Sequence, residues 1–199
     1  GKYSGVAMIN DHTTDLELRE LHEAGVRGIR FNFVAHLGGA PDLDTYWRLV
    51  NRIVPLGWHV ALHFDAKDLL NYAQMLDRMP VPYLIDHMAR IRVEDGLEQE
   101  PFQTLLGMLS DERAWVKLSG VERITATGSP PYNDVLPYVQ ALIATAPDRI
   151  LWGTDWPHPN VQHMPDDGDL VDLLAAFAVD DSVYNRILVE NPERLYPFS

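Results

Sequence analysis

The feature that most constrains the fold is a repeated alternation. A short apolar run is followed by a segment with apolar residues at helical spacing, and this unit recurs six times along the chain. Continuous apolar runs are typical of strands buried on both faces, and strands that alternate with helices predict a parallel sheet covered by helices. The expected strands are residues 5–9, 26–33, 58–64, 83–85, 114–118 and 150–154.

The segments between these strands predict helices, because their apolar residues recur every three or four positions. Glycine residues follow the first two of them, as expected at helix C-termini. The expected helices are residues 15–24, 44–56, 68–78, 102–109, 135–146, 169–178 and 182–188, and Asn191-Pro192 is expected to end the last one.

The number of units indicates which α/β architecture is present. An eight-fold (β/α)8 TIM barrel needs about 250 residues, whereas this chain has 199 residues, six strand–helix units and no initiator Met. We therefore expect a TIM barrel from which two units are absent, with residues 1–199 forming a single domain. An open doubly wound sheet is the alternative, although no Gly-rich phosphate loop follows any strand.

Composition excludes several classes of function. The formal net charge of −13 argues against a nucleic-acid surface and against an anionic membrane. The chain has no cysteine, so disulfides and thiolate-bound metals are excluded. No apolar stretch approaches the length of a membrane span and no secretion signal opens the chain, which favours a cytoplasmic protein.

Polar residues gather where the expected strands end. In a parallel barrel these ends meet at one mouth, so residues far apart in sequence can form one site. Each residue alone has an ordinary structural interpretation, such as a surface ion pair, but together they indicate an active site. They are Arg30, His63, Asp86, His87, Arg90, Ser119, Arg123 and Asp155.

This set of residue types points to hydrolysis. Asp and His can ligate a divalent cation that activates water. Alternatively, Asp acts as general base while His or Arg stabilises an oxyanion. Several arginines in one pocket indicate a substrate with more than one carboxylate. Ser119 lacks a G-x-S-x-G context and is not expected to be a nucleophile, and Lys117 is expected to point elsewhere. The histidines assigned to surface or packing roles are His12, His22, His59 and His163.

Several motifs together resemble one family. They are GIRFNFV (28–34), IDHMAR (85–90), KLSGVER (117–123), WGTDWPHPN (152–160), MPDDG (164–168) and the closing NPERLY. The combination resembles the 2-pyrone-4,6-dicarboxylate lactonases and their relatives in the amidohydrolase superfamily. The resemblance implies a distorted (β/α)8 barrel of which this chain is strands 3 to 8. The first-strand His-x-His pair of that family would then lie in the absent part, since the chain contains no H-x-H.

The resemblance also implies roles for individual residues. Asp155 is similar to the eighth-strand general base, and His87 to the sixth-strand histidine that polarises the lactone carbonyl. Arg30, Arg90 and Arg123 resemble the arginines that hold the substrate carboxylates. The implied activity is opening of a small carboxylated lactone by water, in the breakdown of aromatic compounds.

Two positions depart from the lactonase pattern. His36 stands where the lactonase has another substrate-binding Arg, and His63 stands where it has Tyr. A histidine at the position of His63 is a metal ligand in metal-dependent members of the superfamily. The resemblance therefore leaves two options: one divalent ion, Zn²⁺ or Mn²⁺, held by His63, His87 and Asp155, or no metal with His63 and His36 contacting substrate.

Two other functions stay open on the sequence. A metal-dependent decarboxylase of the same superfamily would use a similar Asp, metal and arginines. A barrel without its first strands would be a catalytically incomplete protein that binds a dicarboxylate. The sequence leaves the oligomeric state open, a homo-oligomer included.

Overall fold

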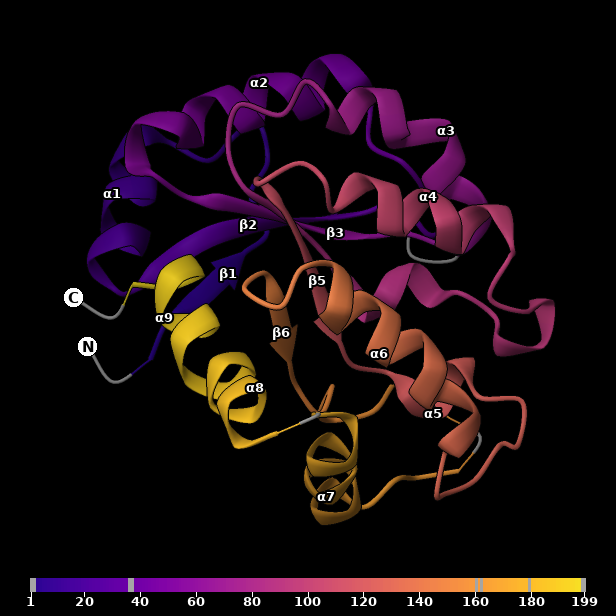
Figure 1. The fold of residues 1–199 in the computed structure, drawn as a ribbon. Coiled ribbons are helices and arrows are strands. Elements are labelled where there is room, and N and C mark those ends of the chain that lie inside the picture. Colours follow the sequence, from indigo (N-terminus) through magenta and orange to yellow (C-terminus); the bar gives the residue numbers. More distant parts are fainter. Residues whose placement is uncertain (1–2, 36–37, 160, 162, 179, 198–199) are drawn as a thin grey trace.

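A parallel sheet forms the centre of the computed structural model, which describes residues 3–35, 38–159, 161, 163–178 and 180–197. The strands are β1 (Gly5–Ala7), β2 (Val26–Asn32), β3 (His59–His63), β4 (Tyr83–Ile85), β5 (Ala114–Leu118) and β6 (Ile150–Trp152). They lie in chain order, all parallel, so β1 and β6 form the two edges. The sheet curls like part of a barrel wall (Figure 1), which confirms the expected parallel α/β fold.

Nine helices are present in the part of the chain that the structure describes, and most of them cover the outside of the curled sheet. They are α1 (Asp15–Glu23), α2 (Leu43–Ile53), α3 (Ala66–Leu76), α4 (Glu100–Met108), α5 (Val121–Ile124), α6 (Leu136–Thr145), α7 (Asp167–Phe177), α8 (Asp181–Asn185) and α9 (Asn191–Leu195). Figure 1 shows α1, α2, α3, α4 and α6 as an arc around the strands. Within the described ranges, every helix is too short or too polar to cross a membrane.

Most elements lie within one or two residues of their expected bounds, and β4 and β5 match them. Two helices differ. The short helix α5 was not expected, and α9 begins at Asn191, where the sequence predicted a helix end. That prediction was wrong because Pro192 lies in the first turn of α9, where a missing N–H costs no hydrogen bond.

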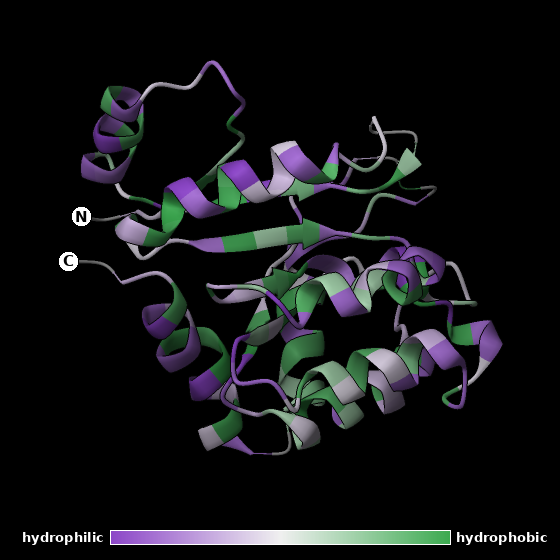
Figure 2. Cartoon of the chain, turned by 90° about the horizontal axis from the view of Figure 1, so that it is seen from above, coloured by the Kyte–Doolittle hydropathy of each residue, from purple (hydrophilic) through white to green (hydrophobic). Residues whose placement is uncertain are grey.

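The convex face of the sheet is apolar. Along β2 the side chains alternate, so that Ile29 and Phe31 face the surrounding helices while Arg30 and Asn32 face the opposite way. Figure 2 shows the helices banded in hydrophilic and hydrophobic colours, as expected for helices that pack one side on a sheet. The convex face and the helices therefore form the main hydrophobic core.

The concave face has two parts. Near the start of the strands, Leu84, Trp115 and Leu151 pack with Leu195 at the end of α9. The ring of the adjoining Tyr196 lies 4.6 Å from the ring of His59, centroid to centroid. Near the carboxyl ends of the strands the concave face is polar, and a cavity opens there.

Candidate active site

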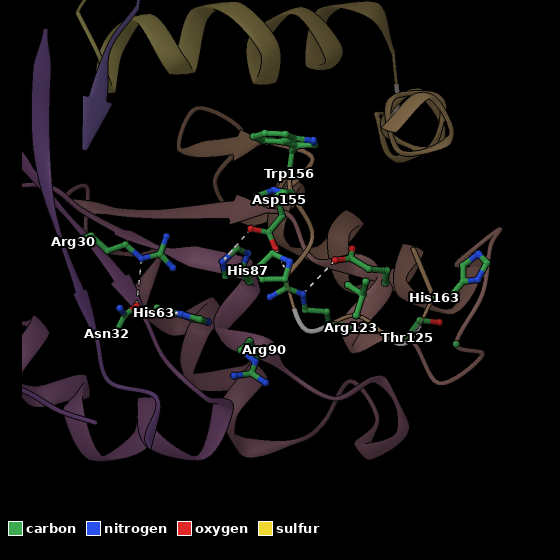
Figure 3. A pocket seen from close by; sticks show the side chains of 15 residues that line it. Arg30, Asn32, His63, His87, Arg90, Arg123, Thr125, Asp155, Trp156 and His163 are labelled. Atoms are coloured by element: carbon green, nitrogen blue, oxygen red, sulfur yellow. Dashed lines mark hydrogen bonds and ion pairs between the residues drawn. The ribbon is translucent and has the colours of Figure 1, made fainter. Parts of the chain in front are cut away.

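A cavity of about 530 Å³ lies at the carboxyl ends of the strands. The structure brings six of the expected site residues together in its wall: Arg30, His63, His87, Arg90, Arg123 and Asp155. Figure 3 shows His87, Asp155 and Arg123 near its centre, with Arg30 and His63 to one side. Another expected substrate-binding residue, His36, lies outside the described residues.

An unusual backbone turn positions His87 and Arg90. The four residues that follow Asp86 have φ values of 53°, 51°, 54° and 52°, so they form a left-handed turn. Asp155 also has a positive φ, of 67°. Each such residue costs about 1–2 kcal/mol relative to the right-handed conformation. Strain of this kind concentrates at functional sites, where surrounding packing maintains it.

His87 is a buried, neutral imidazole. Its Nδ1 lies 2.9 Å from Ser119 Oγ, and Gly120, which has a φ of 70°, adjoins the ring. Burial lowers the pKa of His87 to about 3. Its Nε2 lies 3.7 Å from Asp155 Oδ1. The Ser119 hydroxyl therefore fixes the ring at Nδ1, and Nε2 faces the Asp155 carboxylate.

Asp155 lies between this imidazole and a guanidinium. Its Oδ2 forms an ion pair with Arg123 Nη2. Burial raises the pKa of Asp155, and the charge of Arg123 opposes that effect. Arg123 also has Nε 3.3 Å from Glu122 Oε1, and the Glu122 side chain is only 2% exposed. One arginine thus divides its charge between two carboxylates in the cavity wall.

Lys117 belongs to the same polar cluster, which corrects the expectation that it points elsewhere. Its Nζ lies 2.7 Å from Asp86 Oδ1, and Arg30 Nη1 lies 2.9 Å from Asp86 Oδ2. Burial alone would raise the pKa of Asp86, but the attraction of Lys117 and Arg30 outweighs it and lowers the pKa. The prediction failed because residues two apart on a strand share a face, so Lys117 faces the same way as Ser119.

Asn32 lines the cavity and was not among the site residues expected from the sequence. Its Oδ1 lies 3.4 Å from Arg30 Nε and 3.3 Å from His63 Nδ1. His63 Nε2 is buried and has no hydrogen-bond partner among the described residues. Burial, followed by the charge of Arg30, lowers the pKa of His63 to about 4. The position of Asn32, two residues after Arg30 on β2, was the signal that could have identified Asn32 as a site residue.

The outer wall of the cavity is more exposed. Arg90 Nη1 forms an ion pair of 2.9 Å with Asp65 Oδ1. Trp156, 75% exposed, and His163 also line the cavity. His163 is exposed, as expected, but it is part of the rim rather than of a remote surface. Among the other histidines assigned to packing, His22 accepts a hydrogen bond of 2.9 Å from Trp58.

The expected metal ligands lie near one another but are not arranged as a metal site. The rings of His63 and His87 are 5.0 Å apart, centroid to centroid, and Asp155 already pairs with Arg123. Across the described ranges, no group of three or more His, Asp or Glu side chains is placed to hold a metal ion. The ligand set His63, His87 and Asp155 stays a prediction.

Comparisons with known proteins identify relatives of this chain. The chain is 41% identical to the 2-pyrone-4,6-dicarboxylate hydrolase of Comamonas testosteroni, over 98% of this chain and 67% of that protein. It is 39% identical to the 4-sulfomuconolactone hydrolase of Hydrogenophaga intermedia, over 98% of this chain and 66% of that protein. The chain thus spans about two thirds of the length of these curated relatives.

A solved structure has the same fold. It is a candidate 2-pyrone-4,6-dicarboxylic acid hydrolase from Acinetobacter baumannii with citric acid bound, and it superposes with a TM-score of 0.84 at 28% identity. The match covers 98% of this chain and 73% of the other. The sequence profile of the amidohydrolase family matches residues 3–198. The resemblance seen in the motifs is confirmed, and the chain belongs to the amidohydrolase family.

Proposed function

We propose that this chain supplies the catalytic wall of an enzyme that hydrolyses a small carboxylated lactone. The observation that carries the proposal is that the Asp155 carboxylate lies 3.7 Å from the neutral His87 imidazole, in a cavity that three arginines also line. The names of the two curated relatives, both lactone hydrolases, support this reaction. We place the reaction in the breakdown of aromatic compounds.

The chemistry starts with water held by Asp155. The carboxylate takes a proton as the water oxygen attacks the ring carbonyl carbon, and His87 Nε2–H donates a hydrogen bond to the developing oxyanion. Collapse of that intermediate breaks the ring C–O bond, and the proton on Asp155 passes to the departing oxygen. For Nε2 to carry the hydrogen, Ser119 must donate its hydroxyl hydrogen to Nδ1, which makes Ser119 a positioning residue.

The arginines hold the acid groups of the substrate. Guanidinium groups of Arg30, Arg90 and Arg123 match carboxylates in a two-point geometry. Arg123 has a further consequence, because it pairs with Asp155 in the free protein. A substrate carboxylate that binds Arg123 draws the guanidinium away from Asp155 and leaves that oxygen free to accept the proton. A solved relative contains bound citric acid, a tricarboxylic acid, which is in keeping with an acid as ligand.

A divalent metal would polarise the lactone carbonyl, and His63, His87 and Asp155 are the residues that would hold it. As they lie, they do not form a ligand group, so no step above depends on a metal. Dialysis against a chelator followed by addition of Zn²⁺ or Mn²⁺ tests the point. Loss of activity and its recovery with either ion would establish a metal enzyme, whereas unchanged turnover would establish the metal-free mechanism.

The proposed enzyme is a complete eight-fold barrel in a single domain, in which this chain is strands 3 to 8. Its open edges, β1 and β6, are where two further strand–helix units would pair, and the curated relatives are longer than this chain. The intact mass of the purified protein tests this. A mass well above 22.6 kDa is expected, and a mass equal to it would contradict the completed barrel.

The reaction is tested with 2-pyrone-4,6-dicarboxylate as substrate, by following loss of the ring spectrum and identifying the product by NMR. Ring opening without loss of carbon is expected. Release of carbon dioxide would indicate a decarboxylase instead. Saturable binding without turnover would indicate a dicarboxylate-binding protein, and ligand-induced stabilisation would then be its measurable activity.

A further inference from the structure

The tautomer of His63 follows from its neighbours. Arg30 Nε has no lone pair and can only donate, so the Asn32 atom 3.4 Å away must be the amide oxygen. That oxygen can only accept. His63 Nδ1, 3.3 Å from the same oxygen, therefore carries the hydrogen of the neutral ring. Asn32 thus fixes His63 with hydrogen on Nδ1 and a lone pair on Nε2.

His63 Nε2 is buried and without a hydrogen bond among the described residues, while the ring lies in the wall of the cavity. A buried acceptor left without a donor destabilises the site, so a ligand that donates to it is preferred. A carboxylate oxygen cannot supply the hydrogen, because it is itself an acceptor.

The charges around His63 favour a neutral donor over a cation. The guanidinium groups of Arg30 and Arg90 both act on His63, whereas Asp86 and Asp65 are already paired with Arg30 and Arg90 respectively. Lys117 adds a further positive charge to Asp86. A hydroxyl group meets the lone pair without opposing these charges.

We propose that His63 Nε2 accepts a hydrogen bond from a substrate hydroxyl, so that the preferred ligand is a hydroxylated carboxylic acid or its lactone. The hydroxyl lies close to the carboxylate bound by Arg30, because Arg30 and His63 share the Asn32 oxygen. His63 is then a specificity-determining residue, and Asn32 is the positioning residue that sets its tautomer. The inference rests on the proposed acid-binding lactone site.

Binding of matched acids tests this without turnover. Succinate and malate differ by one hydroxyl, so their dissociation constants, measured by titration calorimetry with both malate enantiomers, isolate that group. One malate enantiomer is expected to bind about fivefold to tenfold more tightly than succinate, the value of one neutral hydrogen bond. Equal affinities, or no binding of any of the three acids at millimolar concentration, would overturn the inference.

Variants assign the preference to His63. His63→Phe is expected to make the affinities for malate and succinate equal. His12→Phe is the matched control: it removes an exposed imidazole that does not line the cavity and should leave the ratio unchanged. A ratio that survives His63→Phe would contradict the proposal. Because His63 is buried, circular dichroism and a melting curve must show that the variant folds.

Substitutions at Asn32 test the tautomer of His63 while the His63 imidazole stays in place. Asn32→Asp keeps an acceptor for Arg30 Nε and His63 Nδ1, so the malate preference should persist. Asn32→Leu removes that acceptor and should reduce the preference severalfold. If the ratio of malate affinity to succinate affinity were the same in both variants, the proposed role of Asn32 would be overturned.

Two further measurements separate this inference from its alternatives. The titrations are repeated in chelator and with added Zn²⁺; a malate preference seen only with zinc would mean that a metal occupies His63, and would overturn the hydroxyl assignment. Hydrolysis of 2-pyrone-4,6-dicarboxylate is measured separately. Absence of turnover with an intact malate preference would contradict the proposed reaction but leave the binding inference standing.

Discussion

The two faces of the sheet are built from the same strands but from different kinds of residue. On β2, Ile29 and Phe31 are buried against helices, whereas Arg30 and Asn32 face the cavity and bond to one another. On β3, Leu62 belongs to the hydrophobic core and its neighbour His63 lines the cavity. Alternate residues along a strand therefore differ in role: one set packs in the hydrophobic core, and the other set lines the cavity.

The two faces also differ in energy. Apolar burial on the convex side stabilises the fold by about 25 cal/mol per Å² removed from water. The concave side buries Asp86 among charged partners, an arrangement that is often no more stable than an apolar one. It also buries the imidazole of His59 without a partner among the described residues. Changes on the two faces should therefore separate stability from activity.

The largest expected effect comes from Asp155→Asn on the concave side. The amide cannot accept the proton from water, so kcat for the carboxylated lactone should fall by about 10³-fold. Substrate affinity should stay nearly intact because the arginines remain. Steady-state kinetics and a melting curve check this. A near-normal kcat would remove Asp155 from the role of general base.

On the convex side, Leu62→Ala should act on stability alone. Leu62 is fully buried, and truncation of such a side chain costs about 2–5 kcal/mol of unfolding free energy. Urea unfolding measures the loss, and Leu62→Met is the conservative control. If KM of the folded variant changed as much as in variants of the adjacent His63, the separation between the faces would fail.

Arg123→Met should separate binding from chemistry within the concave side. Loss of the guanidinium should raise KM for a carboxylated lactone by about 30-fold, while kcat changes little. The matched control is Arg48→Met. It removes an exposed ion pair with Asp11, and Arg48 does not line the cavity. A fall in kcat with unchanged KM would assign Arg123 to the chemical step.

The last prediction concerns the dependence of stability on pH, to which three buried histidines contribute. Burial lowers the pKa of His59 and of His63 to about 4, and that of His87 to about 3. An unfolded histidine titrates near 6.5, so between pH 6.5 and about 4 the unfolded chain binds more protons. Stability should therefore fall as the pH is lowered through this range, by up to about 1.4 kcal/mol per pH unit for each histidine.

Urea unfolding from pH 7 to pH 5 measures this slope. His59→Gln should make the slope shallower, because it removes one of the three titrating groups and lies away from the cavity. If His59→Gln left the slope of stability against pH unchanged, the imidazole of His59 would not be a buried neutral group in the folded protein.

The strands and six cavity residues were predictable from the sequence, because apolar runs locate strands and parallel strands end at one mouth. The contacts between side chains within the site were harder to predict from the sequence. Whether Lys117 meets Asp86, or Asn32 meets His63, depends on the register and twist between neighbouring strands. Helix α9 was missed because Pro192 indicates a helix end and a helix start equally well.

The left-handed turn after β4 has a geometric consequence for the site. In a turn with three residues per revolution, side chains three positions apart stand on the same side. His87 and Arg90 therefore both reach the cavity, while Met88 and Ala89 between them are fully buried. Four consecutive residues thus place the proposed oxyanion donor, His87, and one of the proposed acid-binding groups, Arg90, at a fixed spacing. Inserting or deleting one residue here would turn one of the two side chains into the core.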